Sequence, residues 1–90
     1  MPQIEFTSQL AQHVECPPTQ SIDANSLSEV LQMVFEKYPA MKDYVMTEEG
    51  VLRQHIAVFI DGEMLAQRDE LKIPVDERSE IFVMQALSGG

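Results

Sequence analysis

The amino-acid sequence predicts a small α+β domain in which one main helix packs across a mixed β-sheet. One segment repeats apolar residues at helical spacing, several short segments alternate them as strands do, and turn-forming residues separate these segments. The chain has 90 residues, of which 44% are hydrophobic and 23% charged. These values are ordinary for one globular domain, so we expect a single hydrophobic core.

The first strand is expected over residues 4–7, where apolar and polar residues alternate. Leu10 and Val14 continue the apolar pattern, and we expect them to extend this strand into a hairpin. The pattern ends at Cys16-Pro17-Pro18, because proline donates no backbone hydrogen bond and restricts the residue before it.

The main helix is expected over residues 27–38. Its apolar residues recur at steps of three and four and form one stripe: Leu27, Val30, Leu31, Val34, Phe35 and Tyr38. Ser26 and Glu29 match a capping box at the start of the helix, and Pro39 ends it. An amphipathic helix of this kind needs an apolar surface to lie on, which the strands supply.

The second half of the chain predicts further strands. Residues 41–46 favour a short helical turn, and residues 48–50 a loop. Residues 56–60 form the next expected strand, and Asp61-Gly62 is the strongest short signal for a tight hairpin turn. The short return strand is expected at residues 63–65.

A charged segment over residues 69–80 is expected to cross the molecule, held to the core by Leu71 and Val75. The last strand is expected over residues 81–84. The resulting order of strand, strand, helix, strand, short strand and strand is that of the β-grasp, or ubiquitin-like, architecture, with four to five strands in the sheet. We assign residues 1–86 to this domain and residues 87–90 to a flexible C-terminal tail.

The net charge of −9 comes from 15 acidic and 6 basic residues. Such a surface repels phosphate backbones and anionic membranes, so nucleic acid and membrane are not expected partners, whereas a basic protein is. No apolar run is long enough for a membrane span or a signal peptide. One cysteine cannot form an internal disulfide, and we expect the chain to be cytoplasmic.

Two of the four glycines, Gly89 and Gly90, stand together at the end of the sequence. Without Cβ atoms this backbone is narrow enough to enter a catalytic channel on another protein. A terminal carboxylate has a pKa of about 3.5 and is ionised at neutral pH. It is therefore able to attack an activated phosphate and become an acyl adenylate.

In the order of its elements the whole chain resembles the MoaD/ThiS family of ubiquitin-like sulfur carriers, and the resemblance is most specific from Leu52 to Gly90. The resemblance covers the strand at 56–60, the Asp61-Gly62 turn, the strand at 81–84 and the ending Ala86-Leu87-Ser88-Gly89-Gly90. The spacing is most similar to that of CysO-type members and of the longer molybdopterin synthase small subunits. Two positions depart from the family pattern: Gln85 stands where a proline is common, and Glu77-Arg78-Ser79 replaces an Asp-Gly-Asp turn, so we expect a turn of different geometry.

The resemblance implies a carrier protein rather than an enzyme, with no bound cofactor or metal, and a monomer when free. An E1-like adenylyltransferase would use ATP to adenylate the carboxylate of Gly90, with Gly89 as its slim neighbour. A sulfur donor would then convert the adenylate to a thiocarboxylate, and a sulfur-accepting synthase would receive the sulfur. The pathway stays open between cysteine, molybdopterin and another thiolated metabolite.

The alternation of the strands predicts a docking face. If Ile56, Val58, Ile60, Ile81 and Val83 face the helix, then Phe59, Phe82 and Met84 face away and form one apolar patch. We expect this patch to bind the activating enzyme together with Ala86 and with Leu87 and Ser88 of the tail. The alternative is that residues 39–55 cover the patch.

Other chemistry-bearing residues have plainer interpretations. We interpret Cys16 as an ordinary thiol, and His13 with Cys16 supplies too few ligands for a zinc site. Met41, Met46 and Met64 are expected to fill the core. Two further functions remain possible: a protein modifier conjugated through Gly90, and a ubiquitin-like interaction domain in which the two terminal glycines have no role.

Overall fold

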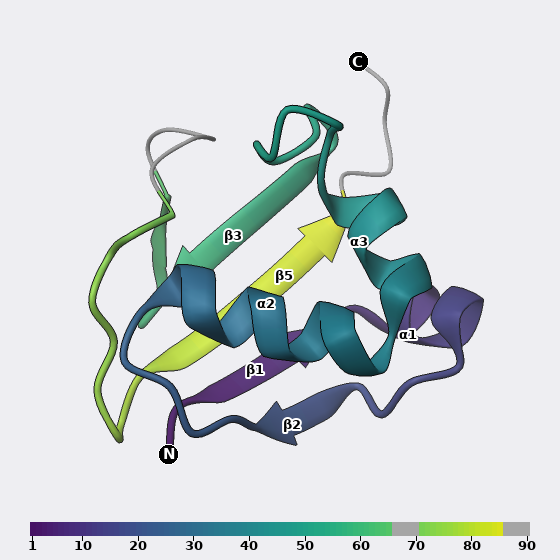
Figure 1. The fold of residues 1–90 in the computed structure, drawn as a ribbon. Coiled ribbons are helices and arrows are strands. Elements are labelled where there is room, and N and C mark those ends of the chain that lie inside the picture. The colour runs from purple at the N-terminus through teal and green to yellow at the C-terminus, as the bar shows by residue number, and fades with distance from the viewer. Residues whose placement is uncertain (66–70, 86–90) are drawn as a thin grey trace.

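The computed structural model describes residues 1–65 and 71–85 (Figure 1). Its elements are β1 (Gln3–Phe6), α1 (Ser8–Val14), β2 (Thr19–Ser21), α2 (Leu27–Lys37), α3 (Pro39–Val45), β3 (Ile56–Ile60), β4 (Glu63–Met64) and β5 (Glu80–Gln85).

The strands form one mixed sheet in the order β2-β1-β5-β3-β4. The central pair β1 and β5 is parallel, and the pairs β1–β2, β3–β5 and β3–β4 are antiparallel. Helix α2 lies across one face of the sheet, and α1 and α3 lie near the end where β5 finishes (Figure 1). The α+β class and the β-grasp arrangement predicted from the sequence are confirmed.

The core lies between α2 and the inner face of the sheet. The three longest strands each bury alternate residues there, and α2 buries the stripe that faces them: Ile4, Phe6, Ile56, Val58, Ile81, Val83, Leu27, Val30, Leu31 and Val34. Ile60, Phe35 and Tyr38 are partly buried against this core. The predicted inward faces of the helix and the strands are therefore confirmed.

Helix α1 replaces the hairpin that we expected around Leu10 and Val14. Strands β1 and β2 do pair in antiparallel fashion, with Ile4 opposite Gln20, but a helix and not a tight turn joins them. Leu10 and Ala11 are fully or almost fully buried. Leu10 and Val14 stand four residues apart, so a helix brings both to one side, and this spacing is the signal that favoured a helix.

Helix α2 begins and ends where the sequence predicts. The Ser26 hydroxyl oxygen accepts a hydrogen bond of 3.2 Å from the backbone N–H of Glu29. The Glu29 carboxylate accepts one of 3.2 Å from the backbone N–H of Asn25, one residue before the position that a standard capping box uses. Pro39 ends α2 and occupies the first turn of α3, which contains the helical turn expected at 41–46.

The Asp61-Gly62 turn joins β3 to β4 as predicted. Both residues have positive φ, 52° and 86°, as the common two-residue hairpin turn requires. The Asp61 carboxylate also accepts a hydrogen bond of 2.9 Å from the backbone N–H of Glu80. The turn is thereby tied to the start of β5.

The described part of the crossing segment caps the start of α2. The backbone N–H groups of Leu27 and Ser28 donate to the carbonyl oxygens of Ile73 (2.9 Å) and Leu71 (2.7 Å). Val75 is buried and Leu71 is partly buried against the core, as expected.

The turn before β5 has the different geometry that its sequence predicts. The Asp76 carboxylate accepts hydrogen bonds from the backbone N–H of Arg78 (2.8 Å) and the hydroxyl of Ser79 (3.3 Å). Arg78 does not have positive φ, so this turn needs no glycine in its place.

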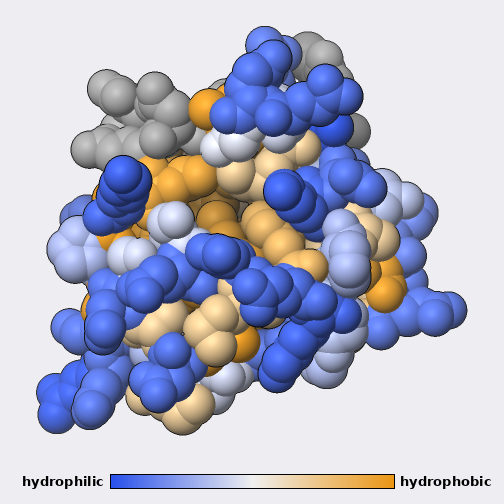
Figure 2. Space-filling model, in the orientation of Figure 1, coloured by the Kyte–Doolittle hydropathy of each residue, from blue (hydrophilic) through white to orange (hydrophobic). Residues whose placement is uncertain are grey.

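The helix side of the molecule is mostly hydrophilic, with apolar residues in the middle (Figure 2). They belong to a hollow of about 440 Å³ between α2 and the loop after α3, lined in part by Leu31, Phe35, Met46 and Leu71. Within residues 1–65 and 71–85, no helix is long and apolar enough to cross a membrane.

Candidate functional site

The C-terminal residues assigned to the site, Ala86, Leu87, Ser88, Gly89 and Gly90, lie outside the described residues. The described part of the chain ends at Gln85, the last residue of β5. Strand β5 lies between β1 and β3 in the sheet, so the tail leaves from a central strand.

The predicted docking residues lie together on the outer face of the sheet. Phe59 of β3 stands directly opposite Phe82 of β5, and Ala57 stands opposite Met84. Opposite side chains on neighbouring strands are about 5 Å apart, so these residues form one patch. All four are partly exposed. We call Phe59, Phe82 and Met84 the open-face patch.

A hollow of about 410 Å³ lies over the open-face patch. Its lining comes from the strands and from the Asp61-Gly62 turn: Gln3, Glu5, Thr19, Phe59, Gly62, Glu80, Ile81, Phe82 and Met84. No residue of 39–55 is among them. That segment instead buries Met41, Val45 and Leu52 in the core on the helix side, so it does not form the cover that was the alternative to docking.

Met64 extends the apolar surface beyond the patch. It stands opposite Phe59 on the edge strand β4, and its side chain is 63% exposed. The expectation that Met64 fills the core was wrong, whereas Met41 and Met46 are buried as predicted. The sequence did carry a signal for the exposure of Met64. Residues directly opposite each other on neighbouring strands point to the same face of a sheet, so the partner of the outward-facing Phe59 also points outward.

Acidic residues border the open-face patch. Glu5 stands opposite Phe82 on β1, and Glu80 begins β5; both are exposed and line the same hollow. Sequence reasoning placed neither at the site. An apolar centre with carboxylates beside it complements a partner that presents apolar side chains bordered by lysine or arginine.

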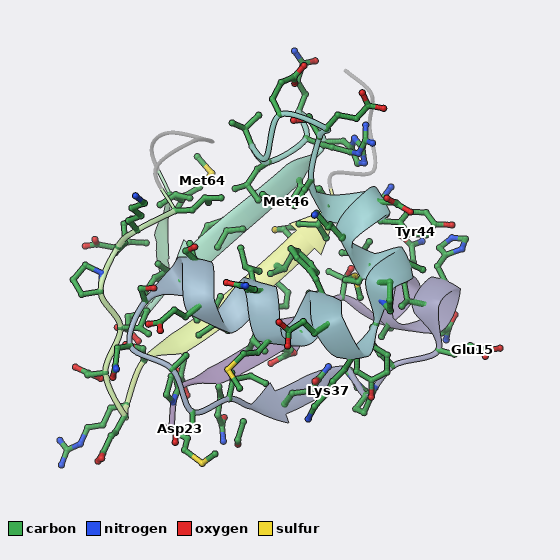
Figure 3. The ribbon with its side chains drawn as sticks, in the orientation of Figure 1. Glu15, Asp23, Lys37, Tyr44, Met46 and Met64 are labelled. Atoms are coloured by element: carbon green, nitrogen blue, oxygen red, sulfur yellow. The ribbon has the colours of Figure 1, made fainter. Side chains whose placement is uncertain are left out.

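A second hollow lies beside the end of β5. Gln9, Gln12 and His13 of α1 and Gln85 of β5 line a space of about 420 Å³, which we call the tail-base hollow. The ring of His13 stacks on that of Tyr44 in α3, with centroids 5.3 Å apart and planes inclined by 27°. Figure 3 shows Tyr44 on the side of α3 nearest α1.

Cys16 is buried just after α1, with 8% of its surface exposed. Burial raises the pKa of the Cys16 thiol, and a backbone hydrogen bond to the residue offsets part of this rise. A neutral, buried thiol is a poor nucleophile. Within residues 1–65 and 71–85, no group of three or more histidine, cysteine or acidic residues is placed to hold a metal ion.

Solved structures with the same fold include CysO proteins and a small archaeal modifier protein, SAMP1. A chain of the Amycolatopsis orientalis BexX/CysO complex superposes with a TM-score of 0.81 at 17% identity, over 100% of both chains. Mycobacterium tuberculosis CysO gives 0.81 at 13% identity, covering 97% of this chain and 100% of that one. SAMP1 from Haloferax volcanii gives 0.77 at 23% identity, covering 99% and 98%.

At these identities the structural likeness establishes the fold alone. A search of curated protein sequences finds no match. The model of the ThiS family matches residues 9–90, which is nearly the whole chain and includes the last strand and both terminal glycines. The chain therefore belongs to the ThiS family, with the ubiquitin-like β-grasp fold that its sequence predicts.

Proposed function

We propose that this chain is a sulfur carrier protein whose Gly90 carboxylate is adenylated and then converted to a thiocarboxylate. The observation that carries the proposal is the extent of the family match, which runs through β5 to Gly89 and Gly90. Membership of the ThiS family supports a ubiquitin-like sulfur carrier or modifier. The thiocarboxylate, its formation and its use are our proposal.

The proposed chemistry takes place in two steps. A carboxylate oxygen of Gly90 attacks the α-phosphorus of ATP held by an E1-like adenylyltransferase, and pyrophosphate leaves. A hydrosulfide ion (HS⁻) released by the sulfur donor then attacks the acyl carbon, AMP leaves with the electron pair of the broken C–O bond, and loss of the sulfur-bound proton leaves the thiocarboxylate. The carrier contributes the carboxylate and a narrow backbone, while the enzyme holds the nucleotide. The process is proposed to take place in the cytoplasm.

The open-face patch is the proposed contact with that enzyme. Phe82 and Met84 stand on β5, five and three residues before the tail begins at Leu87, so a partner that covers them is close to the start of the tail. We propose that a sulfur-accepting synthase binds the same patch, because it too has to receive the end of the tail in its active site. The solved BexX/CysO complex shows that a CysO protein assembles with a second protein.

A protein modifier joined to lysines through Gly90 is the second candidate. The specific observation in its favour is the likeness to SAMP1, a small archaeal modifier protein. Both functions begin with adenylation of the terminal carboxylate, and they differ in what attacks the adenylate. A lysine amine gives an isopeptide-linked adduct, whereas sulfide gives a thiocarboxylate.

Intact and C-terminal peptide masses of the protein from its native host test the proposal. We expect one oxygen to be exchanged for sulfur on the peptide that ends Gly89-Gly90. The change has to be localised to this peptide, because oxidation of any of the six methionines adds nearly the same mass. Gly90 linked to lysine would favour the modifier, and an unmodified carboxylate would contradict both functions.

Phe82→Glu tests the open-face patch. The substitution places a charge in the middle of the proposed contact, and we expect it to abolish formation of the thiocarboxylate. Met33→Glu is the matched control, because Met33 is 39% exposed on α2, on the other side of the sheet. Circular dichroism checks that both variants fold, and normal loading of folded Phe82→Glu would exclude the patch as the contact.

A further inference from the structure

The tail-base hollow is lined largely by a helix that is packed against the rest of the domain. Its residues Gln9, Gln12 and His13 are exposed on α1, while Leu10 and Ala11 hold the same helix against the core. The stack of His13 on Tyr44 ties α1 to α3. The three α1 side chains are therefore presented on a helix anchored from two directions.

The small number of residues between Gln85 and Gly90 bears on which protein covers this hollow. Five residues follow Gln85 in the sequence, and a fully extended chain of five residues reaches at most about 18 Å. Under the proposed function, the enzyme's nucleotide has to lie within that reach of Gln85. An enzyme that binds so short a tail also has to contact the domain around Gln85. Gln85 itself lines the tail-base hollow.

The chemistry of the hollow identifies the kind of contact. Among residues 1–65 and 71–85, its lining has three glutamine amides and one imidazole and no carboxylate, in contrast to the hollow on the sheet, which Glu5 and Glu80 line. Each amide offers two N–H donors and one oxygen acceptor. His13 stacks through the face of its ring, which leaves the nitrogen-bearing edge for hydrogen bonds. This set matches the N–H and C=O groups of a peptide backbone, not a cluster of cations.

We infer that the tail-base hollow is a second docking site, which binds an uncharged main-chain segment of the enzyme that adenylates Gly90. The inference rests on the proposed function. It assigns a different contact to each of two surfaces. The open-face patch binds an apolar and basic area of the enzyme, and the tail-base hollow binds one of the enzyme's loops through hydrogen bonds. Gln9 and Gln12 position the partner and do not touch the reacting atoms.

The test is the double variant Gln9→Ala/Gln12→Ala in the full chain. Alanine favours helix and leaves the charge unchanged, so the fold is retained, and thermal unfolding checks this. The assay is exchange of labelled pyrophosphate into ATP by the organism's own E1-like adenylyltransferase, with the carrier concentration varied. Loss of two hydrogen bonds predicts that the KM for the carrier rises about tenfold while kcat stays within about twofold.

Gln32→Ala is the matched control, because Gln32 is an exposed glutamine on α2 that lines a different hollow. We expect its KM to equal that of the unaltered chain. An unchanged KM for the double variant, or an equal rise for Gln32→Ala, overturns the second docking site while the carrier function stands. Absence of exchange with the unaltered chain overturns the proposed function, and the docking site with it.

Discussion

Cys16 illustrates at the scale of one residue how surroundings decide chemistry. It is the one cysteine of the sequence, and its position behind α1 leaves it buried. Burial raises the pKa of its thiol, because the thiolate would lose its hydration there. The residue therefore takes no part in sulfur transfer as we propose it.

A consequence for stability follows from this shift. Above about pH 8.5, the ordinary pKa of cysteine, the unfolded chain releases the thiol proton more readily than the folded chain does. The free energy of unfolding contributed by Cys16 therefore falls as the pH rises through this range and beyond. Urea unfolding between pH 8 and 10 should show a steeper fall for the natural chain than for Cys16→Ala, and equal slopes would contradict the shift.

At the scale of the element, the N-terminal caps of helices α1 and α2 differ in their hydrogen bonding. Ser26 caps α2 with its hydroxyl, which accepts a bond from Glu29. Thr7 precedes α1 in the same position, but its hydroxyl oxygen is buried and has no hydrogen-bond partner among the described residues. A satisfied cap stabilises a helix, whereas a buried unpaired hydroxyl does not.

Ser26→Ala should therefore lower the free energy of unfolding by about 1 kcal/mol. Thr7→Val keeps the shape of the side chain and removes only the hydroxyl, so we expect a change smaller than about 0.5 kcal/mol in either direction. Urea unfolding of both variants measures the difference. A larger loss for Thr7→Val than for Ser26→Ala would show that the Thr7 hydroxyl has a stabilising partner.

The elements that the sequence predicts well are those with a repeated pattern or a specific turn. The stripe of α2, the alternation of β3 and β5 and the Asp61-Gly62 turn each have one physical interpretation. Helix α1 was missed because seven residues give a single repeat of helical spacing, and Leu10 with Val14 fits a loose strand pattern as well. The tail-base hollow could not be found from the sequence, since it needs α1 beside the end of β5.

At the scale of the whole molecule, the core that the described residues form precedes the C-terminal tail in the sequence. Its buried hydrophobic residues run from Ile4 to Val83. Deletion of Gly89 and Gly90 should therefore abolish thiocarboxylate formation while the free energy of unfolding changes by less than about 0.5 kcal/mol. Sulfur loading and thermal unfolding, measured on the same preparation, separate the two effects, and a marked loss of stability would mean that the tail packs on the domain.

The parallel pairing of β1 with β5 holds the two halves of the sheet together. The ladder joins Gln3 to Glu80, residues from the two ends of the described chain, and β5 alone connects the β1–β2 pair to the β3–β4 pair. A chain that ended before Glu80 would have two separate strand pairs, β1–β2 and β3–β4, each with one unpaired inner edge. Because β5 joins the two strand pairs, we expect the sheet of the whole chain to fold in one step. A fragment without β5 would accept this strand from another molecule, as a strand-exchanged dimer does.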